Sequence, residues 1–144
     1  MIEYGPPEKV YVENEWYDGP RAGIADISGI PHRFKSLFDE GDDEYLGTFM
    51  VWPIDRWVFD LEIEQWQIFV EWNALYDSGQ ADTGSHPGRG QINARWDEIG
   101  TLLKKSRSDV PTSAKRARAQ MSNIDQQVRY APSEPNYALC WSIL

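Results

Sequence analysis

The sequence predicts an α+β domain, an antiparallel sheet of about five to six strands with two helices packed on one face. Alternating segments rich in aromatic and branched residues occupy both ends of the chain. Two segments with helical periodicity lie between them, and clusters of Gly, Pro and Ser separate the segments. This order of strands, helices and strands is typical of the α+β class. At 144 residues, the chain favours one domain that spans residues 1–144.

The first expected strand covers residues 9–17. Val10, Val12 and Trp16 share one alternating face, and Tyr11 and Glu13 lie on the other. The Gly-Pro pair that follows favours a turn.

A β-hairpin is expected next, with its turn at Ser28-Gly29. Branched and aromatic residues flank this turn signal on both sides. Residues 39–44 then hold five acids around a glycine, and we interpret them as a solvated loop (Asp39, Glu40, Asp42, Asp43, Glu44). Another strand follows over residues 45–54.

Two helices should fill the middle of the chain. Asp55 is placed to cap the first, in which Phe59 and Trp66 fall on an apolar face that neighbouring aromatics such as Trp57 widen. On another face of this helix, Asp60, Glu64 and Glu71 can present carboxylates together. The second helix is expected from residue 92, with Ile92, Trp96, Ile99 and Leu103 at spacings of 4, 3 and 4.

The loop between these helices is long and polar, which is typical of a mobile or functional connection, and His86 is expected to be a solvated loop residue. Residues 113–121 and 136–144 alternate and are interpreted as two closing strands, the last of which could return to the first strands. The Lys-Arg-Ala-Arg segment at residues 115–118 could instead be helical. The favoured core tryptophans are Trp16, Trp66, Trp96 and Trp141.

Charge and composition narrow the classes of partner. The net charge is −9; residues 1–88 hold 18 acids and 5 bases, whereas residues 89–144 hold 5 acids and 9 bases. This balance makes nucleic acid an unfavoured partner, even though basic residues gather at 104–107 and 115–118. It fits a basic protein partner that docks on the acidic half. No apolar run reaches the roughly 20 residues that span a membrane, and a single cysteine favours a cytoplasmic setting.

Known catalytic and cofactor patterns do not occur in the sequence. Phosphate-loop and dinucleotide fingerprints, HExxH, CxxC and GxSxG are missing, so we expect no cofactor and no metal. Cys140 lies between Leu139 and Trp141 and is interpreted as a small buried core residue.

One polar group could still form a pocket. Asp18, Arg21, Asp26 and His32 fall close together, with Trp16 and Tyr17 as possible walls. In the structural interpretation, Asp18 supports a turn and Arg21 pairs with an acid. In the functional interpretation, Arg21 holds an anionic ligand and His32, Asp18 and Asp26 are available for acid–base chemistry. Convergence of these side chains would decide between the two.

The segment "WYDGPRAGIADISGIPHRFKSLFDE", residues 16–40, resembles a motif of small bacterial proteins. That motif runs roughly W-Y-D-G-P-R-x-G-I-A-D-x-x-G-x-P-H-x-F. No activity is established for those proteins, so the resemblance implies a bacterial or phage setting and one compact domain, but no reaction.

The resulting expectation is a non-enzymatic interaction protein of the immunity, inhibitor or adaptor kind. Its acidic residues would steer a partner and its exposed aromatics would anchor it. Candidate binding residues are therefore Trp16, Tyr17, Asp18, Arg21, Asp39, Glu40, Asp42, Asp43, Glu44, Asp60, Glu64 and Glu71. The alternative is a small ligand-binding module or enzyme with its pocket around Asp18, Arg21, Asp26 and His32.

Overall fold

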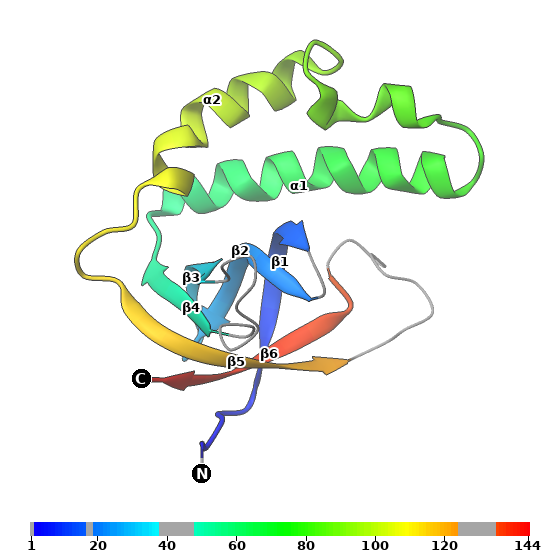
Figure 1. The fold of residues 1–144 in the computed structure, drawn as a ribbon. Helices are drawn as coiled ribbons and strands as arrows, with labels where there is room; N and C mark the ends of the chain where they lie inside the picture. Colours follow the sequence, from blue (N-terminus) through cyan, green and yellow to red (C-terminus); the bar gives the residue numbers. More distant parts are fainter. Residues whose placement is uncertain (1, 17–18, 38–47, 124–134) are drawn as a thin grey trace. The chain divides into compact units, whose positions relative to one another are not determined.

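The computed structural model describes residues 2–16, 19–37, 48–123 and 135–144 (Figure 1). The chain divides into two compact units, one formed by residues 1–54 with 110–144 and the other by residues 55–109. The elements described in the first unit are all strands, and those described in the second are helices. The expected acidic loop at 39–44 and the residues Tyr17 and Asp18 lie outside the described part of the chain.

Six strands form the first unit and close into an antiparallel barrel in the order β1-β2-β3-β4-β5-β6. They are β1 (Pro7–Trp16), β2 (Pro20–Ile27), β3 (Ile30–Ser36), β4 (Thr48–Pro53), β5 (Lys115–Asn123) and β6 (Tyr137–Ile143). The expected strands, including the weakly patterned β5, are present. The sheet is closed rather than open, because β6 returns to pair with β1. Closure leaves neither β1 nor β6 as a free edge.

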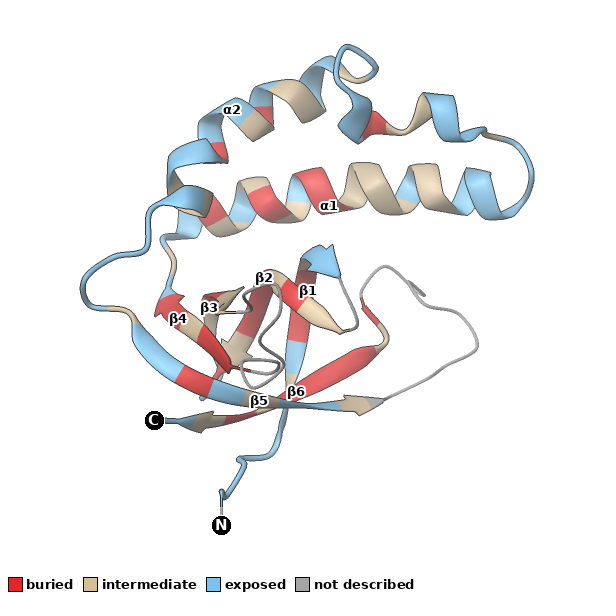
Figure 2. Cartoon of the chain, viewed as in Figure 1, coloured by how far each residue is buried: buried red, intermediate tan, exposed pale blue. Residues whose placement is uncertain are grey.

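Alternation along each strand fills the barrel with large apolar side chains. Phe34, Phe49 and Trp141 meet there, with ring centroids 5.5 to 5.8 Å apart. Val10, Ala25, Ile27, Val51, Ala117, Tyr137 and Leu139 complete this core. Figure 2 draws the buried positions of the strands in red, and these core residues are among them. Cys140 is on the opposite strand face from Leu139 and Trp141, so it is partly exposed rather than buried as expected.

The β2–β3 hairpin forms at the turn that the sequence predicts. Ser28 (φ 54°) and Gly29 (φ 76°) both have positive φ, as a two-residue type I′ turn requires. The carboxylate of Glu8 accepts hydrogen bonds from both turn amides, at 2.9 Å from Ser28 N and 2.8 Å from Gly29 N. A residue of β1 thus holds the hairpin turn.

The helical unit contains α1 (Arg56–Asp77), the short helices η2 (Thr83–Ser85) and η3 (Pro87–Arg89), and α2 (Ala94–Ser108). Asp55 occupies the N-cap position of α1, but its side chain makes no capping hydrogen bond. Asn93 caps α2, and its side chain accepts a bond from Trp96 N at 2.9 Å. The second helix therefore begins two residues later than expected, and Ile92 is half exposed outside it.

The set of buried tryptophans differs from the set that the sequence predicted. Trp66 and Trp141 are buried, but Trp16, the last residue of β1, is 42% exposed. Its ring packs against that of Tyr137, with the centroids 5.7 Å apart. Trp96 is half-buried. Trp52, which the sequence did not single out, is buried at 6% exposure.

Candidate functional site

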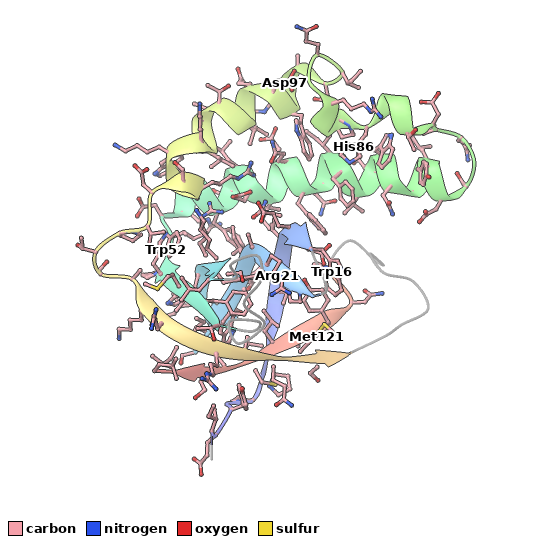
Figure 3. All side chains as sticks on the ribbon, viewed as in Figure 1. Trp16, Arg21, Trp52, His86, Asp97 and Met121 are labelled. Carbon is pink, nitrogen blue, oxygen red and sulfur yellow. The ribbon has the colours of Figure 1, made fainter. Side chains whose placement is uncertain are left out.

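The polar group expected near the first hairpin does not converge. Arg21 is buried on the β2 face that also carries Gly23 and Ala25, and Asp26 is on the opposite face. His32 pairs across strands with Ala25, four residues beyond Arg21, which corresponds to roughly 13 Å along β2. Figure 3 shows Arg21 and Trp16 on the barrel.

Each described member of that group has a local setting of its own. Asp26 accepts a hydrogen bond from the Tyr11 hydroxyl at 3.0 Å. His32 Nδ1 donates to the Ile30 carbonyl at 2.7 Å, because a carbonyl oxygen can only accept, so Nε2 is the remaining ring nitrogen. An acid–base pocket made of Arg21, Asp26 and His32 therefore has no geometric basis.

His32 instead lines a groove at one end of the barrel. The groove encloses about 480 Å³. Its lining comes from the β2–β3 hairpin, from β4, from the first residue of β5 and the segment before it, and from the end of β6 (Ile27, Ser28, Ile30, His32, Val51, Pro53, Ser113, Lys115, Ile143). Sequence reasoning found His32 but missed its neighbours, since only the barrel closure brings them together.

A buried polar hub connects the two long helices. Glu62 of α1 is fully buried, and Arg107 of α2 donates to it from Nε at 3.0 Å and from Nη2 at 2.5 Å. Nη2 of Arg107 also contacts the Gln65 side-chain oxygen at 2.6 Å. Gln65 in turn donates to the Trp96 carbonyl at 3.0 Å. The periodicity of α1 does not reveal Glu62 as an interior residue, because its charge is typical of a solvent face.

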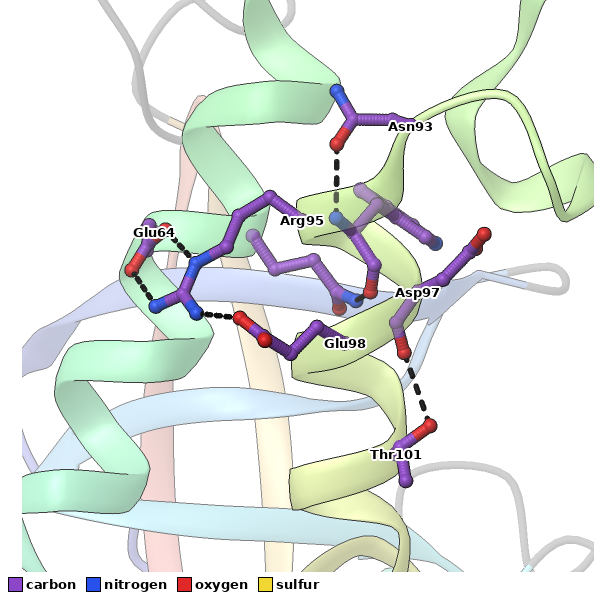
Figure 4. A network of polar contacts seen from close by, with 8 residues as sticks. Glu64, Asn93, Arg95, Asp97, Glu98 and Thr101 are labelled. Atoms are coloured by element: carbon purple, nitrogen blue, oxygen red, sulfur yellow. Dashed lines mark hydrogen bonds and ion pairs between the residues drawn. The ribbon is translucent and has the colours of Figure 1, made fainter.

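A second polar clamp between the helices is exposed (Figure 4). Arg95 of α2 donates to Glu64 from Nε at 2.5 Å and from Nη2 at 2.7 Å, and its Nη1 contacts Glu98. The hydrogen bond from Arg95 holds the pKa of Glu64 below its ordinary value, and the two carboxylates raise the pKa of Arg95. Glu64 therefore stays ionised near neutral pH.

His86 lies within a ring cluster rather than in a solvated loop. Its ring centroid is 4.5 Å from that of Trp72, 5.8 Å from Phe69 and 6.4 Å from Trp96. Its Nδ1 accepts a hydrogen bond from Gly88 N at 2.9 Å. Burial, followed by the charge of Arg89, lowers the pKa of His86. The expected solvated loop thus packs a neutral imidazole against both helices.

The outward face of α1 bears a mixed acidic and apolar stripe. Trp57, Asp60, Glu64, Glu71 and Leu75 recur at helical spacing and are all exposed; we call them the outer stripe. Trp57 and Leu75 are 53% and 46% exposed, although the sequence placed Trp57 with the buried residues. At 1.5 Å per residue, the stripe is about 27 Å long. The predicted carboxylate face is thus present, and two large apolar side chains bracket it.

The described residues offer no group of three or more His, Cys, Asp or Glu side chains that could hold a metal ion. No described helix combines the length and apolar character needed to cross a bilayer. The chain matches no protein-family model, no curated protein and no solved structure, so its own geometry carries the functional argument.

Proposed function

We propose that this chain is a non-enzymatic interaction protein, of the immunity, inhibitor or adaptor kind, that presents the outer stripe of α1 to a protein partner. The observation that carries the proposal is the exposure of Trp57 and Leu75 at the two ends of an acidic helix face. Large apolar side chains in such positions act as anchors when they enter pockets on a partner.

The outer stripe carries three carboxylates, and because only two of them pair with an arginine that the structure describes, the remaining negative charge favours a basic partner. Asp60 pairs with Arg56 at 2.9 Å, and Glu64 pairs with Arg95. Glu71 has no ion pair within the described part of the chain. Charges at the rim of an interface chiefly raise the association rate and fix orientation, and salt weakens both effects.

Photo-crosslinking can test the proposal. A photoreactive phenylalanine at position 57 or 75 should capture the same protein in the native host, and capture should fall as salt rises. The matched control is position 102, because Leu102 is 50% exposed but lies on α2. Equal capture of that protein from positions 57 and 102 would contradict the proposal.

Affinity measurements with the captured protein follow. Trp57→Ala should weaken binding by about 2 kcal/mol or more, roughly thirtyfold, as for a central aromatic anchor. Leu102→Ala should leave the dissociation constant unchanged. A Trp57→Ala variant that binds as well as the natural chain would remove Trp57 as an anchor.

A further inference from the structure

The groove at the end of the barrel is built from inward-facing strand positions. Trp141 of β6 and Ala117 of β5 belong to the barrel core. Ile143 lies two residues after Trp141 and Lys115 lies two residues before Ala117, so each is on the same strand face as its core neighbour but nearer the end of the barrel. Phe34 and His32 have the same relation on β3. The groove is therefore the mouth of the barrel, above a closed aromatic core.

The floor and walls of the groove are apolar. Ile27 and Val51 are buried at its base, with exposed fractions of 9% and 3%. Ile30 and Ile143 are 56% and 46% exposed at the rim. Exposed branched side chains beside a concave surface are a feature of ligand sites. The enclosed space of about 480 Å³ is in the range that holds small organic molecules.

The polar groups of the groove favour a negative charge. Lys115 lines the groove and makes no ion pair with any described residue. His32 contributes its ring, and Ser28 and Ser113 contribute hydroxyl groups. None of the lining residues is acidic. The carboxylate of Glu8 does not line the groove, and each of its oxygens accepts a backbone amide hydrogen bond from the β2–β3 turn.

We propose that the barrel mouth binds a small organic monoanion, a carboxylate on an apolar body, with Lys115 holding the charge and the isoleucines enclosing the body. A single lysine matches one negative charge better than it matches a polyphosphate, which recruits several cations. This site is on the barrel unit, whereas the proposed protein-binding stripe is on the helical unit, so each proposal can fail without the other.

The probe for this test is 4-phenylbutyrate, and 4-phenylbutylamine is its cationic control with the same apolar body. In an amide NMR titration of the full chain, the carboxylate should shift the resonances of Ile27, Ile30, Lys115 and Ile143. The amine should leave them in place. Equal shifts with both probes, shifts confined to other residues, or no shift at millimolar concentration would overturn the proposal.

Two variants and a control separate charge recognition from nonspecific binding. Lys115→Gln should weaken binding of the carboxylate probe about tenfold, which is the size expected for the loss of a hydrogen bond to a charged group. Ile143→Glu, which places a carboxylate at the rim, should abolish the shifts. Lys104→Gln removes an exposed lysine from α2 and should change nothing. Unchanged affinity in Lys115→Gln would exclude Lys115 as the anchor.

Discussion

The buried hub between α1 and α2 should respond unequally to the loss of its two charges. Arg107→Ala removes three close contacts, two of which are made to the fully buried carboxylate of Glu62. Breaking a buried ion pair by removing one of its partners costs about 3–5 kcal/mol of unfolding free energy. Glu62→Gln keeps the size of the side chain and one acceptor oxygen. In that variant water can solvate the Arg107 side chain, which is 30% exposed. Glu62→Gln should therefore lower the unfolding free energy by only about 1–2 kcal/mol.

Urea unfolding followed by far-ultraviolet circular dichroism and tryptophan fluorescence measures both losses. Arg95→Gln is the matched control, because it removes an arginine from an exposed clamp on the same helix and should shift the midpoint much less than Arg107→Ala. If Arg107→Ala were no more destabilised than Glu62→Gln, the burial of the carboxylate would not govern the energetics. A loss below about 1 kcal/mol of unfolding free energy in Arg107→Ala would lead to the same conclusion.

Three further outcomes are expected. Because burial lowers the pKa of His86 from 6.5, its contribution to stability is present above that pH and lost as pH falls; thermal melts should show this fall, and His86→Asn should flatten it. Gly23→Ala should destabilise the barrel by about 3 kcal/mol or more in urea, since the new Cβ would lie 2.1 Å from the Val12 carbonyl oxygen; Gly5→Ala, with a nearest contact of 3.5 Å, is the control that should stay near the natural stability. Glu8→Ala should cost about 1 kcal/mol of thermal stability by releasing the β2–β3 turn, and an unchanged melting temperature would argue against that role.

Local patterns predicted the elements well because each depends on neighbouring residues. Ser28-Gly29 specified its turn, and the alternation of β5 was sufficient to place a strand there despite its arginines. The closure of the barrel depends on the pairing of β1 with β6, which join opposite ends of the chain. No local pattern reports such a pairing, so the sequence left the return of the last strand to the first strands only as a possibility and did not predict a barrel.

The same distinction between local patterns and contacts of distant segments separates the site residues that were predicted from those that were not. The carboxylates of the outer stripe were predictable from helical spacing, and all three are exposed. The burial of Glu62 and the ring cluster around His86 were not, because each needs a partner from the second helix. The barrel mouth needs four separate segments to meet. Hydrophobic periodicity predicts which face of a helix or strand a side chain occupies, but it does not identify the residues of other elements that pack against that face.

The position of the helical unit in the chain bears on how the barrel folds. β4 and β5 are hydrogen-bonded neighbours, yet all of residues 55–109 lie between them. Joining two strands across a flexible loop loses entropy that grows with loop length, by about 0.6 kcal/mol for each doubling. Once α1 and α2 have paired, that long segment no longer samples the conformations of a free chain, and the effective loop between β4 and β5 is short. Early formation of the helix pair should therefore accelerate the β4–β5 pairing, so that a variant with a weakened hub would assemble its barrel more slowly.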